Sequence, residues 1–368
     1  IGTVITDTYE ANPFKNLGMD NPNGSQRYYI GHVNWTGFNG LMEYTGSDKF
    51  SAVLQVGTSS QDYQWEGFYT AAPDTKSRVV TVNGGYIKGG ANYRANDNSN
   101  FFFNVGQIMR PPSFDGVFPN ADYDFEEADE ILNESFTSFE LGYGFRSSNF
   151  KGTINAYHTV WGDRTLRRST SIDDQGVRII YSGVEQTHQG IEGEMTWYPS
   201  SRLRVKGMFS LGDWKYTKNF QGDAYFIDNN QPAGTTGTLY LDGVKIGDAA
   251  QTVLYLGFDY KLSSKLSVDL DMMSYDNLHG RFGPLDSEFN SANNRGSIKL
   301  PSWGTADLGA TYSFNLLGYD ARARLNVNNL FDEEYLSQSQ TNFHNDGGRT
   351  WNGVNVENLS LIHISEPT

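Results

Sequence analysis

The side chains best suited to bind a ligand are aromatic residues that fall in stretches expected to be loops. Exposed aromatic clusters mark binding surfaces, because stacking and desolvation of the rings contribute strongly there. Arg110 stands at the start of one such loop, where it could meet an anionic ligand. The predicted ligand-binding residues are Trp65, Phe68, Tyr69, Arg110, Phe118, Tyr123, Trp214 and Tyr216. The alternative is that the rings pack on one another and Arg110 only caps the rim, and the sequence does not choose between the two.

Bond-making chemistry has no comparable candidate. The six histidines lie far apart in the sequence, and none belongs to a His-x-x-x-His or His-Glu-x-x-His ligand pair. The chain has no cysteine, which argues against thiol catalysis and zinc–thiolate sites. An acidic run over 122–130 lacks the glycine of a calcium-binding EF-hand loop, so we interpret it as a solvated loop. We therefore expect no catalytic residue, no metal site and no cofactor, and predict that the protein is not an enzyme.

The elements that would position a ligand site are strands with two chemically different faces. The clearest one lies over 320–328, where apolar and polar side chains alternate strictly. The apolar set is Ala321, Ala323, Leu325 and Val327, and the polar set is Arg322, Arg324, Asn326 and Asn328. A period of two indicates a β-strand. In a transmembrane barrel the apolar face of such a strand meets lipid, and the polar face lines the lumen.

Composition narrows the class of protein. The chain has 368 residues, a formal net charge of -15, and high counts of Gly (40), Tyr (22) and Phe (23), with a mean hydropathy of -0.53. No apolar run approaches the roughly 20 residues of a transmembrane helix, which excludes a helical membrane protein. Glycine with aromatic residues favours β-structure. The acidic balance disfavours nucleic acid as a partner, because phosphate binding needs a basic excess.

A strand–turn–strand–loop unit recurs roughly every fifty residues. The short turns are expected at 45–48, 95–98, 146–149, 199–202, 261–264 and 315–319, and the long loops at 64–78, 110–134, 163–177, 217–245, 278–300 and 331–347. Short periplasmic turns with long external loops are the arrangement of outer-membrane barrels. A soluble β-propeller has a similar period but needs four short strands per blade. We therefore predict an all-β fold, a partial antiparallel transmembrane β-barrel of about thirteen strands with long extracellular loops.

Particular motifs resemble the barrel of TonB-dependent outer-membrane receptors. The segment 329–335, Asn-Leu-Phe-Asp-Glu-Glu-Tyr, is similar to the family signature Asn-Leu-Phe-Asp-x-x-Tyr before the last strand. Arg110-Pro111-Pro112-Ser113-Phe114 resembles the family's Arg-Ala-Pro-Ser loop start, with Pro111 in place of the usual Ala. The segments 140–143 and 348–351 also resemble family positions, and 87–93 resembles the Bacteroidetes-type receptors.

The resemblance implies how the chain is organised. The family's barrel has about 22 strands around a plugged lumen, so residues 26–357 correspond to its C-terminal part, with the last strand expected over 347–357. Residues 1–25 are expected to be an extracellular loop segment, and 358–368 a non-native tail. The plug and TonB box are expected to be absent, which makes the chain a fragment. Lumen residues expected to face the plug are Glu140, Glu192, Arg322, Arg324 and Asn326.

The function implied by the resemblance is TonB-coupled uptake across the outer membrane of a Gram-negative bacterium. The cargo would be a bulky, scarce nutrient, either a ferric siderophore or similar chelate, or an oligosaccharide. Its partners would be outer-membrane lipid, TonB–ExbB–ExbD through the missing plug, and the small-molecule or glycan ligand. The alternative is a passive outer-membrane porin or a channel for hydrophobic compounds, which shares the barrel but lacks a plug. A hydrolase would need a Ser-His-acid or paired-carboxylate site on adjacent strands.

Overall fold

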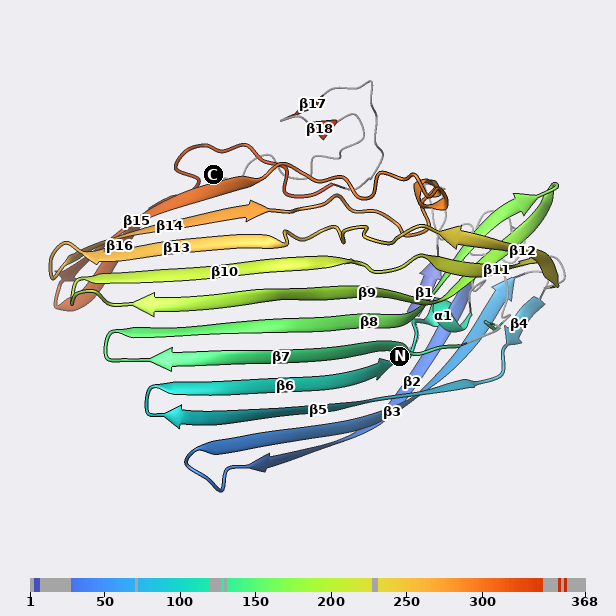
Figure 1. Ribbon diagram of the computed structural model, residues 1–368, viewed down its shortest axis with the longest axis horizontal. Helices are drawn as coiled ribbons and strands as arrows, with labels where there is room; N and C mark the ends of the chain where they lie inside the picture. Colours follow the sequence, from blue (N-terminus) through green and yellow to red (C-terminus); the bar gives the residue numbers. More distant parts are fainter. Residues whose placement is uncertain are drawn as a thin grey trace.

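One large antiparallel sheet of 16 strands dominates the protein and curves into an open wall (Figure 1). The computed structural model describes residues 3–6, 28–69, 72–118, 127–128, 131–226, 231–339, 350–351 and 354–355. The long strands of the wall are β2 (Tyr28–Tyr44), β3 (Phe50–Tyr69), β5 (Val80–Asn96), β6 (Ser99–Arg110), β7 (Glu134–Arg146), β8 (Phe150–Ile172), β9 (Gln175–Trp197), β10 (Leu203–Tyr216), β13 (Thr252–Lys261), β14 (Leu266–Asp276), β15 (Trp303–Leu316) and β16 (Tyr319–Val327). Each pairs with the next in this order, so the wall is a succession of hairpins.

Shorter elements flank the wall. The short strands are β1 (Thr3–Thr6), β4 (Ala72–Lys76), β11 (Phe220–Phe226), β12 (Pro232–Leu239), β17 (Thr350–Trp351) and β18 (Val354–Asn355), and the helical turns are α1 (Phe114–Val117) and η1 (Ser287–Asn290). No helix in the described ranges is both long and apolar enough to cross a membrane. The all-β architecture predicted from the sequence is confirmed, and the sheet of the described residues does not close on itself.

The two ends of the wall differ, as the repeat predicted. The six short connections lie together at one end, on the left in Figure 1, and span 45–49, 97–98, 147–149, 198–202, 262–265 and 317–318. In the tightest of these, Leu317 and Gly318 both have positive φ, 53° and 89°. Positive φ at both central residues gives the two-residue turn whose twist matches that of the flanking strands. We call this the turn end, and the opposite end the loop end.

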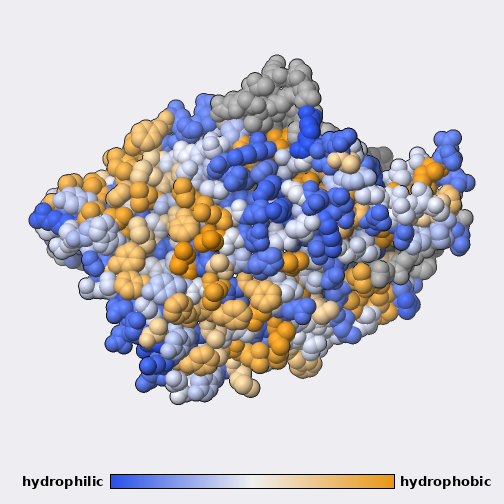
Figure 2. Space-filling model, in the orientation of Figure 1, coloured by the Kyte–Doolittle hydropathy of each residue, from blue (hydrophilic) through white to orange (hydrophobic). Residues whose placement is uncertain are grey.

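Strand register gives the wall one apolar and one polar face. Leu270, Leu308 and Val327 lie in one cross-strand row, and the neighbouring row contains Asp269 and Asn326. Because successive side chains point to opposite sides of a strand, the first row belongs to the apolar face and the second to the polar face. Figure 2 shows apolar residues gathered in a broad band toward the turn end, with hydrophilic residues around it.

Three small cores hold the loop end together. One surrounds Trp65 and Phe118 and includes α1's Val117. The second brings β9, β11 and the segment around η1 together, with Phe289 fully buried in it. The third gathers Leu278, Ile298, Leu300 and Leu336. These clusters are the described hydrophobic cores, so burial stabilises the loop end, whereas the wall is held by its strand ladders.

Part of the chain expected to be loop is strand instead. The loop predicted over 163–177 is the tip of the β8–β9 hairpin, which turns at Asp173 and Asp174 with φ of 51° and 62°. The predicted loop 217–245 contains the β11–β12 hairpin, and β11 pairs with β9. Near the N-terminus, Thr3–Thr6 pairs with β2 although a loop was expected there. All four of its residues are β-branched, which favours extended backbone.

The structure describes only four residues of the expected last strand. Most of 347–357 lies outside the described residues. Its described parts, Thr350–Trp351 and Val354–Asn355, pair with each other in a separate two-stranded sheet. The tail 358–368 lies entirely outside the described residues.

Candidate ligand-binding site

Three of the predicted loop aromatics are buried. Trp65 is 2% exposed and Phe118 is fully buried, both in the cluster around α1, where Tyr29 stacks on Trp65 with centroids 6.1 Å apart. Tyr216 is 3% exposed in the second loop-end core. In this structure these rings pack into two separate cores of the loop end and are not open to solvent.

The other predicted residues divide into two groups. The structure describes only the backbone of Phe68 and Tyr69, and Tyr123 lies outside the described residues. Arg110 and Trp214 lie on the polar face near the loop end, where strand residues join them to form a continuous surface. This surface is the candidate site.

Arg110 belongs to a stack of aromatic and charged side chains at the ends of β6, β7 and β8. Its guanidinium forms an ion pair with Glu134 and lies 5.2 Å from the ring centroid of Phe136 and 5.8 Å from that of Trp161. The two rings are stacked at 5.2 Å. The Glu134 carboxylate also accepts a hydrogen bond from the Trp161 indole nitrogen at 3.2 Å. The stack fixes Arg110, and the charge of Arg110 is already balanced.

A β-bulge adds a second arginine to the same stack. The register of β8 against β9 shifts between Trp161 and Arg164, and Asp163 within the shift has φ of 57°. Side chains three positions apart in a regular strand point to opposite faces, and a bulge changes this relation. Arg164 consequently lies over the Trp161 ring at 4.2 Å and donates a hydrogen bond to the side-chain oxygen of Gln186 at 3.3 Å.

Next to the stack, three rings form a second cluster, which we call the aromatic platform: Tyr157, His188 and Trp214. The Trp214 indole nitrogen donates a 2.8 Å hydrogen bond to the Tyr157 hydroxyl, and His188 lies 5.4 Å from Trp214. The platform needs glycine beneath it. A Cβ at Gly190 would stand 2.8 Å from the Tyr157 hydroxyl oxygen, and one at Gly212 would stand 2.8 Å from the Trp214 indole nitrogen.

Gln186 joins the stack to the platform. Its side-chain oxygen accepts from Arg164, so its amide NH₂ faces the His188 Nε2 at 3.0 Å. An amide nitrogen only donates, and His188 Nε2 is therefore the acceptor of the neutral ring. Gln186 is 5% exposed, so the bridge forms the floor of the site.

The binding residues predicted from the sequence did not include Phe136, Tyr157, Trp161 and His188, because none of these four lies in an expected loop. All four are strand residues. The available signal was their position in the alternation: Tyr157 and Trp161 share a strand face with Asn155 and Lys151. An aromatic ring on the polar face of a barrel strand is poorly placed for lipid and well placed for a ligand.

The predicted lumen residues Glu140 and Glu192 lie on the polar face and are hydrogen-bonded within the wall. Glu140 accepts from Asn104 at 2.9 Å and from Asn155 at 3.0 Å. Glu192 accepts from the Ser210 hydroxyl at 3.0 Å. Neighbouring strands thus satisfy these carboxylates, and the expectation that they contact a plug stays a prediction.

The other three predicted lumen residues are on β16. Arg324 forms a two-pronged ion pair with Asp269 on β14, at 2.9 and 2.8 Å. The pair reaches across β15 over Gly309, where an added Cβ would collide with both side chains. Arg322 and Asn326 occupy the same face and are exposed.

A similar contact crosses β13. Lys206 on β10 lies 3.3 Å from Asp271 on β14, and the intervening residue is Gly257, whose Cβ would stand 2.6 Å from the Asp271 carboxylate. Asp259 is shared by Lys206 at 3.5 Å and Arg204 at 2.8 Å. The polar face of β10–β14 is a network of compensated charges.

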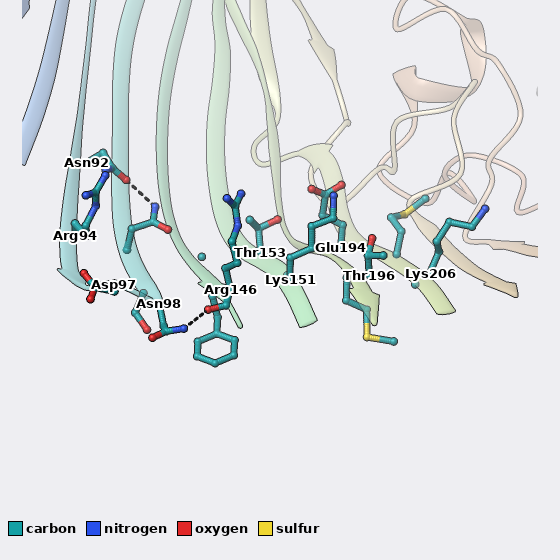
Figure 3. A pocket seen from close by; sticks show the side chains of 18 of the residues that line it. Asn92, Arg94, Asp97, Asn98, Arg146, Lys151, Thr153, Glu194, Thr196 and Lys206 are labelled. Atoms are coloured by element: carbon teal, nitrogen blue, oxygen red, sulfur yellow. Dashed lines mark hydrogen bonds between the residues drawn. The ribbon is translucent and has the colours of Figure 1, made fainter. Parts of the chain in front are cut away.

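The turn end of the polar face carries a separate hollow of about 740 Å³. Figure 3 shows its charged and polar side chains along the strand ends; among them are Arg94, Asp97, Arg146, Lys151, Glu194 and Lys206. Asn98 anchors the rim by donating a 2.6 Å hydrogen bond to the Arg146 carbonyl. Aromatic rings are scarce here, so the hollow suits polar contacts rather than stacking. Within the described ranges no three His, Asp or Glu side chains come together as metal ligands.

Charged residues appear on β10 just beyond the apolar band, toward the loops. Asp213 follows Leu211 on the same strand face and lies 2.8 Å from Lys215; it also pairs with Lys245 of the following loop. Hydrogen bonds from Lys215 and Lys245 lower the pKa of Asp213 to about 2. This pairing ties the loop to the wall outside the apolar band.

Residues 3–330 match the family model described as "TonB dependent receptor-like, beta-barrel". No curated protein matches the sequence. Among solved structures, the siderophore receptor PiuA from Acinetobacter baumannii is similar with a TM-score of 0.62 and 14% identity, over 86% of this chain and 41% of that one.

Two further structures show the same fold. The copper transporter OprC has a TM-score of 0.55 and 12% identity, over 84% of this chain and 45% of its own. The ferripyoverdine receptor of Pseudomonas aeruginosa has a TM-score of 0.52 and 15% identity, over 85% of this chain and 36% of its own. The chain therefore spans less than half the length of each of these structures, and identities this low show the fold alone.

Proposed function

The chain belongs to the family of TonB-dependent receptor β-barrels, and from this premise we propose that it is the wall of a receptor that takes up a bulky, scarce nutrient. The family places it in the outer membrane of a Gram-negative bacterium. The observation that carries the proposal is the match over residues 3–330, which includes the wall from β1 to β16.

The chemistry of the two faces supports this assignment. An apolar band on one face suits lipid, and a hydrogen-bonded polar face suits a lumen. Short turns then lie on the periplasmic side, and the loops face the exterior. The stack and the aromatic platform lie on the lumen side near the loops, where a ligand arriving from outside would first meet the wall.

We further propose the partners that such uptake needs. A plug domain would occupy the lumen, and TonB–ExbB–ExbD would act on that plug. The cargo is a ferric siderophore or similar chelate, or an oligosaccharide. Structural neighbours that are siderophore receptors support the chelate. The family and its neighbours are transport receptors and not enzymes.

Uptake of radiolabelled ferric chelates by cells carrying the full-length receptor tests the proposal. We expect accumulation that stops when a protonophore collapses the inner-membrane gradient or when tonB is deleted. A strain lacking the receptor gene is the control. Accumulation that persists without TonB would instead identify a passive channel, which is the alternative function.

A further inference from the structure

Among the described residues, the Arg164 guanidinium is a cation with only neutral partners. It contacts the Trp161 ring and the Gln186 amide oxygen. Across the described ranges no carboxylate lies within 4.0 Å of it. Its Nε is buried and has no hydrogen-bond partner among the described residues. A half-buried charge without a counter-ion is unfavourable, so this arrangement requires an explanation.

The neighbouring arginine shows that the stack does not by itself exclude a counter-ion. Arg110 lies over the same indole and is paired with Glu134. On the far side of the wall, Arg324 is paired with Asp269. Arg164 therefore differs in charge balance from Arg110 and Arg324, two of the three arginines that the sequence analysis selected. The third, Arg322, is exposed to water, whereas Arg164 is half-buried.

The backbone is shaped to present Arg164 on this face. Without the bulge at Asp163, a side chain three residues after Trp161 would point to the opposite side of the strand. The bulge places a non-glycine residue at φ of 57°, a conformation that costs free energy and is often found at functional positions. The bulge at Asp163 thus brings a second guanidinium over the Trp161 indole.

We propose that Arg164 is the anion-recognising residue of this wall, and that the transported ligand carries an oxyanion, such as a carboxylate or phenolate, next to a flat apolar part. This deepens the proposed function and rests on it. Guanidinium groups bind planar oxyanions through two parallel hydrogen bonds. With one guanidinium face on Trp161 and Nε buried, the N–H groups of the two terminal nitrogens that do not bond to Gln186 are left to meet an oxyanion. The flat part of the ligand then lies toward Tyr157 and Trp214.

The geometry disfavours a neutral glycan as the cargo. A sugar could stack on the platform, but it would leave Arg164 without a counter-charge after the loops exclude water. An anionic chelate balances that charge, and its hydrogen bonds with the guanidinium are stronger where water is excluded. The Arg164–Gln186–His188 bridge would transmit this contact to the platform, because Gln186 holds both neighbours.

Binding to the purified full-length receptor tests the proposal through tryptophan fluorescence. The probes are ferric tris(2,3-dihydroxybenzoate) and ferric citrate as anions, ferrioxamine B as a cationic iron complex, and maltoheptaose as a neutral glycan. We expect at least one anion to bind, Arg164→Gln to weaken it about tenfold or more, and Arg164→Lys to weaken it less. Arg168→Gln removes a positive charge from the same hairpin, where Arg168 contacts Asn290, and should bind as the wild type does.

The outcomes of this experiment show whether Arg164 recognises an anion. Three results would each overturn the assignment. Arg164→Gln could bind the anions as tightly as the wild type does, only ferrioxamine B or maltoheptaose could bind, or both anions could fail to bind. A heat-modifiable band on a gel shows that each variant is folded, and Arg164→Lys keeps the charge if Arg164→Gln does not fold. If binding depends on Arg164 but uptake does not depend on TonB, the proposed function is wrong and the assignment of Arg164 to anion recognition is still supported.

Discussion

At the scale of single residues, the candidate site depends on positions where the chain has no side chain at all. Tyr157 and Trp214 meet because Gly190 and Gly212 leave room for their rings. The site therefore depends on these glycines as much as on the aromatic residues, because the absence of a Cβ leaves the space that the rings occupy.

Gly212→Ala tests this dependence. The added methyl would stand 2.8 Å from the Trp214 nitrogen, so the indole must move and its hydrogen bond to Tyr157 is lost. We expect a loss of about 0.5–1.5 kcal/mol in stability and a changed near-UV circular dichroism signal from tryptophan. Gly40→Ala is the control, because its methyl would meet only Val56, at 3.8 Å. Equal behaviour of the two variants would contradict the packing argument.

Asp213 gives a pH-dependent prediction. Its pKa is about 2 in the folded protein because Lys215 and Lys245 donate to it, against an ordinary 3.8. The stabilisation is therefore complete above pH 4 and is lost as the pH falls toward 2. We expect the unfolding temperature of the wild type to fall over this window and that of Asp213→Asn to be lower at pH 7 and to change less. Parallel pH profiles for the two proteins would refute the assignment.

At the scale of elements, the strands and their faces were predictable because a half-apolar strand admits only one orientation. A register shift by one residue would move every apolar side chain to the wrong side. The turns were predictable from their polar residues and regular spacing. The extension of β8 and β9 was not, because strand continuation beyond the apolar band has no alternation of hydrophobicity to mark it.

The site itself was only partly predictable. Arg110 and Trp214 were found because they adjoin loops, whereas Arg164 was missed because its orientation depends on the bulge at Asp163. The burial of Trp65 and Phe118 depends on α1 folding back over β2 and β3. Such contacts join segments that are distant in sequence, and the local pattern of residues does not contain them.

Paired substitutions on β16 test which face meets lipid. Leu325→Arg places a charge on the apolar face, where Leu325 is 69% exposed, and should destabilise the barrel by about 2–4 kcal/mol if it lies near the bilayer midplane. Asn326→Arg adds the same charge on the polar face and should have little effect. Urea unfolding of the full-length receptor in lipid vesicles measures both. A greater loss for Asn326→Arg would invert the face assignment.

At the scale of the whole molecule, the described sheet has open edges. Two edges of the described sheet have backbone N–H and C=O groups without a strand partner. One is the outer edge of β2 beyond its pairing with β1, and the other is the outer edge of β16. In lipid such groups cannot be left unsatisfied. The wall therefore needs further strands to close a barrel.

This gives a prediction for the chain expressed by itself. We expect no heat-modifiable, protease-resistant band after refolding into detergent or vesicles, because open edges favour aggregation over insertion. The full-length receptor, refolded in parallel, is the positive control. A compact, protease-resistant species from this chain alone would show that the described strands can satisfy their own edges.

The contacts across Gly190, Gly257 and Gly309 have a mechanical consequence. Each joins side chains of two strands that are not neighbours, Tyr157 to Trp214, Lys206 to Asp271 and Arg324 to Asp269. Such contacts across a middle strand resist sliding of adjacent strands past one another, so a load applied to one strand is shared by three. If a pulling force acts inside the lumen during uptake, these contacts let the wall stay stiff while whatever it encloses is moved.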